Sequence, residues 1–558
     1  MKALPLLCET AMRNSKLIKL ALRLLGSLIT VATLSKPAFS ADRVYLSYGL
    51  LERSISVSSL DTYARSGTID NDLYVYTQYI NSAQLQNLRR ALLARADVPP
   101  IAVAQFLYTP QGEILLRRLG QVIQPESRDT GFYAIRAALI LASADPEGLT
   151  ALNIFRKFPT RGIRIDLQRS LEITGDLGDL INETNRATQR IEELARAEAT
   201  PIPPGTQFAD LGARGGYGFQ KETLQLVDRS RGFVPALGRQ RVFPVDVYLP
   251  RRSSGRNSIP VVVISHGLGS DRATFQYLAE HLASHGFAVA VPEHPGSNAA
   301  QLQALIAGTA SEVASPTEFI DRPLDIKFLL DDLTRRSGSD ARYAQLNLQN
   351  VGVLGQSFGG YTVLALAGAP INFAQLQRDC SAQALDNTLN LSLLLQCRAG
   401  ALPPIRYNLS DPRVKAIIAI NPIASSIFGG SGIRDIRIPT MIVSGNADTI
   451  APALPEQIKP FTQLQANDRY LAIIDRGTHF STLGESQNDV PLPTDVIGPT
   501  PAIAQRYTRA LSLAFFETYI ANNPRYRAYL SPTYAQALSR DPLRLSLIQA
   551  LTLAQLNR

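Results

Sequence analysis

Residues 352–363 read GVLGQSFGGYTV, and Ser357 stands there between Gly355 and Gly359. A β-branched run precedes this stretch and small apolar residues follow it, which predicts a strand, a sharp turn and a helix. Glycine on both sides permits such a turn, and the turn lifts a serine hydroxyl above the sheet at a helix N-terminus. We therefore predict that Ser357 is a nucleophile, with a purely structural serine as the alternative.

A serine nucleophile needs a positioned base, normally a histidine that a carboxylate orients. The chain has five histidines, and only His479 follows Ser357, in DRGTHFST after the apolar run YLAII. Asp448 lies between the two, directly after the strand-like run TMIVSGNA, whereas the end of the preceding strand-like run offers Asn421 and no carboxylate. We predict a triad of Ser357, Asp448 and His479. In folds with this kind of turn the acid and then the histidine follow the serine along the chain. A surface histidine and a simple turn aspartate are the alternatives.

Acyl transfer also needs hydrogen-bond donors for the oxyanion that develops on the substrate. The backbone N–H of Phe358, next to the nucleophile, is one candidate. The loop HGLG after the run VVVIS supplies the other, and we choose Leu268, with Gly267 as the alternative. His266 in this loop is expected to stabilise the loop or line the site rather than act as a base. His294, in PEHPGS, is a further candidate for lining the site.

The elements that must carry these residues alternate between strand-like and helix-like runs over residues 226–525. Near-continuous apolar runs such as IPVVVISHG and VKAIIAINP are separated by amphipathic segments such as TFQYLAEHLASHG. This alternation is typical of a mostly parallel, doubly wound sheet with helices on both faces, an α/β fold. Residues 370–412 interrupt the pattern as a long insertion, and the leucine-rich part of it, 389–396, could form a lid, an acyl-facing wall or a packing helix.

The remaining chain divides into smaller parts. Residues 41–200 begin with two short strand-like runs and continue with helix-like segments such as NSAQLQNLRRALLARA, which predicts a mostly helical domain. Proline and glycine accumulate around 199–219, and we expect a linker over 201–225. Residues 526–558 are expected to form a C-terminal helical appendage.

Residues 1–40 have the pattern of a secretory signal. Basic residues precede the apolar run LALRLLGSLITVATL, and a small-residue site ends at Ser40, so we expect export with cleavage before Ala41. An uncleaved anchor is the alternative, although Arg23 interrupts an apolar run that is short for a membrane span. Cleavage removes six Lys or Arg and one Glu and lowers the net charge from +9 to about +4, with no basic block, so we expect no nucleic-acid partner.

Two cysteines remain after cleavage, Cys380 and Cys397. In an exported chain they favour a local disulfide over free thiols. Without a third sulfur or a nearby histidine they are a poor metal site, so we predict neither a metal nor a cofactor.

With these motifs in place, residues from about 235 to 522 resemble the α/β-hydrolase superfamily, and SHGLG with GQSFGG is similar to its platelet-activating-factor acetylhydrolase and dienelactone hydrolase branches. The acetylhydrolase resemblance implies ester hydrolysis with backbone donors at Leu268 and Phe358. Secreted acetylhydrolases place the acid one strand earlier, where this chain has Asn421, so Asp448 resembles the general hydrolase pattern instead. The segment from GLLERSISVSS to about Ile181 resembles a helical domain of unknown function found ahead of hydrolases in photosynthetic bacteria.

The leading hypothesis is therefore an exported, metal-independent serine hydrolase of carboxylic esters, with lipid esters of the acetylhydrolase type as its substrate class. Hydrolysis of small soluble or lactone esters is the alternative within enzymes. A noncatalytic binding protein that kept the fold is the alternative outside them. A peripheral membrane contact and the oligomeric state are left open by the sequence.

Overall fold

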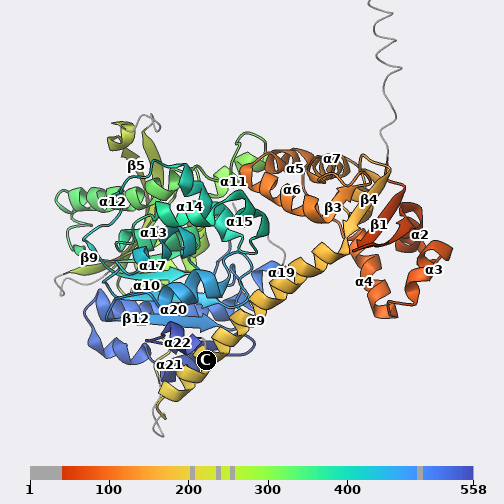
Figure 1. The fold of residues 1–558 in the computed structure, drawn as a ribbon. Helices are drawn as coiled ribbons and strands as arrows, with labels where there is room; N and C mark the ends of the chain where they lie inside the picture. The colour runs from red at the N-terminus through yellow and green to blue at the C-terminus, as the bar shows by residue number, and fades with distance from the viewer. Residues whose placement is uncertain (1–39, 202–207, 234–239, 252–257, 487–493, 557–558) are drawn as a thin grey trace, which may run out of the picture. The chain divides into compact units, whose positions relative to one another are not determined.

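The computed structural model describes residues 40–201, 208–233, 240–251, 258–486 and 494–556 (Figure 1). The expected signal peptide lies outside the described residues, apart from Ser40. The chain divides into two compact units: one holds the residues up to Val103 and Leu116–Leu171, and the other holds Ala104–Leu115 and the residues from Glu172 onward. Within the described ranges, no helix combines the length and apolar character needed to cross a bilayer.

The first unit contains a small four-stranded sheet and short helices. Its strands are β1 (Arg43–Tyr48), β2 (Leu51–Ser56), β3 (Ile123–Pro125) and β4 (Gly162–Asp166), in the order β2-β1-β4-β3. Its helices are α2 (Val57–Ser66), α3 (Asn71–Thr77), α4 (Ser82–Leu93), α7 (Phe132–Ser143) and α8 (Ala151–Arg156), while α5 (Pro100–Leu107) and α6 (Pro110–Val122) contribute residues to both units. The side chains of Ser56, Asp70 and Asn81 cap α2, α3 and α4 by accepting hydrogen bonds from backbone amides.

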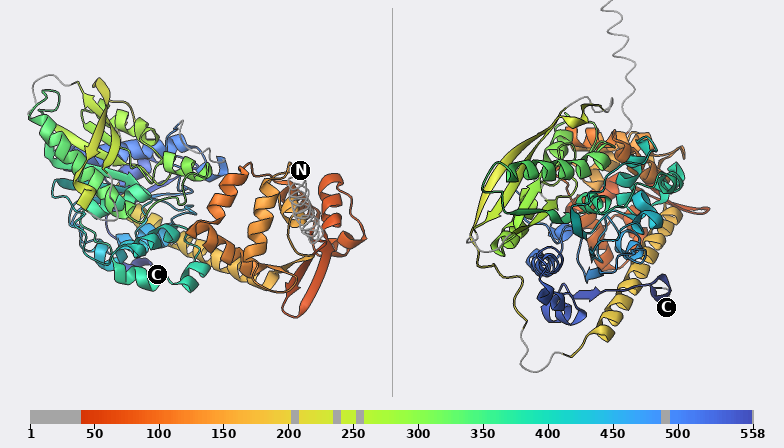
Figure 2. Two further views of the ribbon diagram at one scale, coloured as in Figure 1. Left: turned by 90° about the horizontal axis from the view of Figure 1, so that it is seen from above. Right: turned by 90° about the vertical axis from the view of Figure 1, so that its left-hand side faces the viewer.

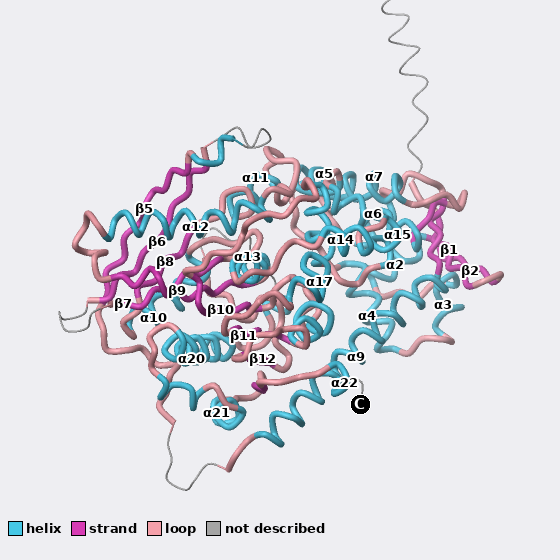
Figure 3. Tube along the Cα trace, turned by 60° about the vertical axis from the view of Figure 1, so that its left-hand side comes forward, coloured by secondary structure: helices cyan, strands magenta, loops and turns pink. Residues whose placement is uncertain are grey.

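A nine-stranded sheet forms the second unit. Its strands are β5 (Phe219–Asp228), β6 (Arg241–Pro250), β7 (Ile259–Ser265), β8 (Ala288–Pro292), β9 (Leu346–Gln356), β10 (Val414–Ile420), β11 (Thr440–Gly445), β12 (Arg469–Ile474) and β13 (Leu545–Ile548). They are ordered β13-β12-β11-β10-β9-β7-β8-β6-β5, and Figure 3 shows the part of this order from β12 to β5 in magenta. The strands from β7 to β12 run parallel, whereas β5, β6 and β13 pair antiparallel with their neighbours. The carboxyl ends of six parallel strands therefore meet at one edge, where such sheets bind ligands.

Helices cover both faces of this sheet. One face packs against α12 (Glu318–Ser337), α13 (Phe358–Leu366) and α17 (Ser425–Ile433), and the other packs against α10 (Gln276–Ser284), α20 (Pro501–Tyr519) and α21 (Pro532–Leu538). Further short helices are α11 (Ala299–Ile306), α18 (Lys459–Phe461), α19 (Thr494–Ile497), α22 (Leu553–Leu556), the 3₁₀ helices η1 (Ser230–Phe233), η2 (Ala273–Phe275) and η5 (Pro524–Tyr529), and the π-helix η4 (Leu454–Ile458). The predicted mostly parallel, doubly wound α/β fold is confirmed.

The boundaries of the parts differ from the expected ones. The helix α9 (Leu167–Glu198) is continuous, and its residues from Glu172 on belong to the second unit, where Ile191 is buried in the core. A helical domain over 41–200 is thus wrong at its carboxyl end. The expected linker 201–225 ends early, because β5 begins at Phe219.

The C-terminal segment is not a helical appendage as expected. Its strand β13 pairs antiparallel with β12, and Leu545 and Leu547 are buried against the sheet. In Figure 2 this dark-blue segment lies beside the gold helix α9, where Arg544 forms an ion pair with Glu192 at 3.2 Å. Residues 526–558 therefore help to complete the core.

The insertion at 370–412 is helical and tied to the core. It contains α14 (Phe373–Asp379), α15 (Ala382–Asn387), α16 (Ser392–Gln396) and the 3₁₀ helix η3 (Cys397–Ala401), and a disulfide joins Cys380 to Cys397. The buried carboxylate of Glu456 accepts hydrogen bonds from Gln396 Nε2 and from the backbone amides at the start of α17. Leu393 and Leu395 of the leucine-rich run are buried, so these two side chains pack against the core.

Candidate active site

Ser357 occupies a strained turn between β9 and α13. Its φ is 56° and its ψ −115°, a conformation that few residues other than glycine adopt. The flanking glycines are required by close backbone contacts. A Cβ on Gly355 would lie 2.1 Å from the carbonyl oxygen of Gly359, and a Cβ on Gly359 would lie 2.1 Å from that of Ser265. The sequence pattern therefore marks a real steric constraint.

His479 and Asp448 continue from Ser357 in a chain of hydrogen bonds. The serine Oγ lies 2.8 Å from His479 Nε2, and His479 Nδ1 lies 2.6 Å from Asp448 Oδ2. The second carboxylate oxygen, Oδ1, accepts hydrogen bonds from the backbone amides of Ile450 and Ala451 at 2.8 and 2.7 Å. These two bonds fix the orientation of the carboxyl group. With Nδ1 donating to the carboxylate, Nε2 is left to accept the serine proton.

Two further side chains hold the loop that carries His479. Gln356 donates from Nε2 to the carbonyl of His479 at 3.0 Å. Asn421 donates from Nδ2 to the carbonyls of Thr478 and His479 at 3.2 and 3.3 Å, and its Oδ1 accepts the amide of Gly445 at 2.9 Å. Asn421, which directly follows β10, thus clamps the histidine loop to β11. These supporting roles were not predicted, because the partners are backbone atoms distant in the sequence.

The loop after β7 lies beside the nucleophile. A Cβ on Gly267 would lie 2.4 Å from Gln356 Oε1 and 3.4 Å from Ser357 Cβ. Within the described part of the chain, the backbone amides of Leu268 and Phe358 donate no hydrogen bond to protein. The amides chosen from the sequence are therefore free to bind a substrate oxygen.

His266 and His294 do not line the site as expected, because both side chains are fully buried. His266 Nε2 accepts the backbone amide of His294 at 3.0 Å, so the proton of the ring is on Nδ1, which donates to the carbonyl of Gly267 at 2.8 Å. Burial and the charge of Arg322 hold the pKa of His266 well below its usual value. Its role is to stabilise the loop.

His294 belongs to a second, buried Ser-His-Asp chain. Its Nε2 lies 3.0 Å from Ser265 Oγ and its Nδ1 lies 2.8 Å from Asp325 Oδ2. Burial lowers the pKa of His294 to about 3, so the ring is neutral. All three side chains are fully buried, which denies a substrate access to this serine.

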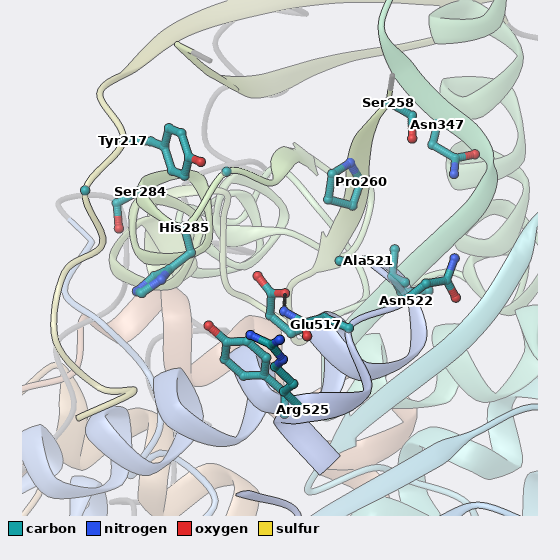
Figure 4. A pocket seen from close by; sticks show the side chains of 15 residues that line it. Tyr217, Ser258, Pro260, Ser284, His285, Asn347, Glu517, Ala521, Asn522 and Arg525 are labelled. Carbon is teal, nitrogen blue, oxygen red and sulfur yellow. Dashed lines mark hydrogen bonds between the residues drawn. The ribbon is translucent and has the colours of Figure 1, made fainter. Parts of the chain in front are cut away.

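A cavity of about 760 Å³ lies away from these groups. Figure 4 shows its polar lining, which includes Pro260 and Asn347 at the amino ends of β7 and β9. Ser357 follows the carboxyl end of β9, at the opposite edge of the sheet. This cavity is therefore separate from the candidate active site.

Two family models match different parts of the chain. The model described as an alpha/beta hydrolase of unknown function (DUF1400) matches residues 40–166, and that of platelet-activating factor acetylhydrolase, isoform II, matches residues 240–322. The second match includes the loop that carries Leu268.

Bacterial cutinases are similar over about half of the chain. Cutinase 2 of Thermobifida cellulosilytica is 24% identical over 294 residues, covering 51% of this chain and 77% of the cutinase. Cutinase cut1 of Thermobifida fusca is 24% identical over 294 residues, covering 51% of this chain and 63% of the cutinase. Cutinase est1 of Thermobifida alba is 22% identical over 303 residues, covering 53% and 71%. The sheet topology and these similarities together show that the protein is a member of the α/β-hydrolase superfamily.

Proposed function

We propose that this protein is a serine hydrolase that cleaves carboxylic esters through an acyl-enzyme. The observation that carries the proposal is the hydrogen-bonded chain of Ser357, His479 and Asp448 beside two backbone amides that have no partner among the described residues. The similarities to cutinases and to the acetylhydrolase model support an ester hydrolase.

The geometry is suited to a two-step reaction. Ser357 Oγ attacks the ester carbonyl as its proton passes to His479 Nε2, and Asp448 stabilises the imidazolium that forms. The carbonyl oxygen becomes an oxyanion that accepts from the amides of Leu268 and Phe358. Collapse of this intermediate breaks the bond to the alcohol, which leaves with the proton from His479. The same histidine then takes a proton from water, which attacks the acyl-enzyme and releases the acid.

Labelling with a fluorophosphonate tests the proposal directly. We expect wild type to be labelled at Ser357 and Ser357→Ala to be unlabelled. Ser512→Ala is the matched control, since Ser512 is a buried serine of α20, and it should be labelled as wild type is. An adduct on another serine would overturn the assignment, and an unlabelled wild type that turns over no ester would favour the noncatalytic binding protein.

For the substrate class we propose lipid esters, with small soluble or lactone esters as the second candidate. The acetylhydrolase match around the oxyanion loop favours the first. Turnover of a 2-acetyl phospholipid, of p-nitrophenyl acetate and of a small lactone separates the two: preference for the phospholipid supports lipid esters, and preference for the soluble ester or the lactone supports the alternative.

We also propose that the protein is exported, because residues 1–40 have the pattern of a signal peptide and the chain carries a disulfide. Production in a secreting bacterial host should give a mature chain whose intact mass begins at Ala41. A mass that retains Met1 and the apolar run would support the uncleaved anchor instead.

A further inference from the structure

Arg322 is a fully buried arginine on α12 that contacts both halves of the proposed oxyanion hole. Its Nη2 donates to the carbonyl of His266 at 2.6 Å, in the loop that carries Leu268. Its guanidinium carbon lies 4.5 Å from the centre of the Phe358 ring, on the residue that follows the nucleophile. One side chain therefore links the two segments that carry the amides of Leu268 and Phe358.

The arginine has no carboxylate partner within ion-pair distance among the described residues. The acidic side chains one turn away on α12, Glu318 and Asp325, are engaged elsewhere. Arg241 binds both of them, at 2.7 and 3.0 Å, and Arg231 also binds Asp325. Arg322 Nε and Nη1 have no hydrogen-bond partner in the described structure. Burying such a cation is costly, so its retention calls for a compensating role.

A second anchor holds the same loop from its other side. Ser265 is the last residue of β7, and its hydroxyl donates to Nε2 of the neutral His294. His294 is in turn fixed by Asp325 through Nδ1. The backbone amide of His294 also donates to His266 Nε2. The start of the oxyanion loop is thus fastened to α12 by a continuous set of hydrogen bonds.

We propose that Arg322 and His294 are positioning residues that hold the segment Ser265–Gly269 against α13, so that the amides of Leu268 and Phe358 converge on one oxyanion. This inference rests on the proposed ester hydrolysis. The cation of Arg322 lies behind these amides and adds a positive potential that favours the oxyanion over the neutral ester. Neither residue touches the substrate.

The test compares kcat and KM for p-nitrophenyl butyrate, with active sites counted by fluorophosphonate labelling. Removing one oxyanion donor outright costs about 10²–10³-fold in kcat. For Arg322→Met we expect kcat to fall by about 100-fold with KM within twofold of wild type. Arg322→Lys keeps the charge and should recover about tenfold. The matched control is Arg413→Lys, since Arg413 is a half-buried arginine directly before β10 that pairs with Asp411 and Asp331 and lies outside this network, and its kcat should stay within twofold.

Phenylboronic acid supplies a readout that a general loss of stability does not move. It forms an anionic tetrahedral adduct with an active-site serine, so its inhibition constant should rise with Arg322→Met by about the factor that kcat loses. An unchanged kcat per labelled site in Arg322→Met would overturn the inference, as would an equal loss in Arg413→Lys. If Arg322→Met does not fold, Ser265→Ala removes only the hydroxyl that binds His294, and we expect kcat to fall about fivefold, whereas an unchanged kcat would again overturn it.

The two proposals can fail separately. Wild type that is neither labelled nor active would overturn the proposed function and this inference with it. Wild type that is labelled at Ser357 and active, beside a fully active Arg322→Met, would overturn the inference alone.

Discussion

At the scale of single residues, the site depends on which side chain faces the imidazole of His479. Asp448 accepts the Nδ1 proton, whereas Asn421 turns its amide nitrogen toward backbone carbonyls of the same loop. The two positions are therefore not interchangeable in this chain.

A double substitution tests this assignment. Asp448→Asn should lower kcat by about 10⁴-fold, the loss seen when a triad carboxylate becomes an amide. Adding Asn421→Asp should not restore activity, because a carboxylate there would face the carbonyl oxygens of Thr478 and His479. Steady-state kinetics on a p-nitrophenyl ester measures both. Recovery in the double variant would show that the acid can be supplied from β10.

Glycine at the turn offers a steric prediction with a matched control. In Gly359→Ala the new Cβ would lie 2.1 Å from a backbone oxygen that cannot swing aside, so we expect a loss of several kcal/mol or no folded protein. Gly400→Ala, in η3, has no atom within 4 Å of the new Cβ and should unfold as wild type does. Urea unfolding compares them, and a Gly359→Ala variant of wild-type stability would contradict the close approach.

At the scale of elements, the insertion is held by covalent and polar ties at once. The disulfide of Cys380 and Cys397 closes a loop with a sequence separation of 17. The amide of Ser392 donates to the carbonyl of Ile450 at 2.7 Å, next to the segment that orients Asp448. The insertion therefore braces the loop of the proposed catalytic acid.

Breaking the disulfide should loosen this brace. A loop of about this length contributes about 3 kcal/mol through chain entropy. We expect Cys380→Ser with Cys397→Ser to lower the free energy of unfolding by up to this amount and to reduce kcat more than it changes KM. Dithiothreitol should reproduce the effect in wild type and leave the double variant unchanged. An equal free energy of unfolding of wild type with and without dithiothreitol would contradict this role of the disulfide.

The elements also show what could be predicted. Ser357, Asp448 and His479 each follow an apolar run, so the sequence places them at strand ends, and the structure brings them within hydrogen-bonding distance. The charges of α12 were different. The burial of Arg322 and Asp325 could not be predicted, because burial of a charge depends on partners elsewhere in the chain. β5 alternates exposed and buried residues in FQKETLQLVD, which resembles a polar linker.

At the scale of the whole molecule, several buried histidines make stability depend on pH. Burial holds the pKa values of His266, His281 and His294 far below the unfolded value near 6.5. As pH falls below about 6.5, the histidines of the unfolded chain bind protons, whereas the buried rings of the folded protein stay neutral. The free energy of unfolding therefore falls. Each such histidine contributes about 1.4 kcal/mol per pH unit.

Urea unfolding between pH 7 and pH 5.5 measures this slope. Three described carboxyls act in the opposite direction where they titrate, since burial raises the pKa of Glu198, Glu293 and Glu318. Their contribution is common to wild type and to a histidine variant, so the difference between the two slopes reports the histidine alone. His281→Gln, on α10 and outside the site, should make the slope shallower by one histidine. A slope that does not change would show that His281 is not held neutral in the folded protein.

The second Ser-His-Asp chain bears on how enzymes are recognised. Ser265, His294 and Asp325 are hydrogen-bonded at 3.0 and 2.8 Å, close to the 2.8 and 2.6 Å of the proposed triad, so a search by interatomic distance would match both sets among the described residues. Only one can meet a reagent from solution. We expect an electrophilic probe to react with Ser357 and not with Ser265, because access from solvent, and not the set of hydrogen-bond partners, distinguishes the two serines.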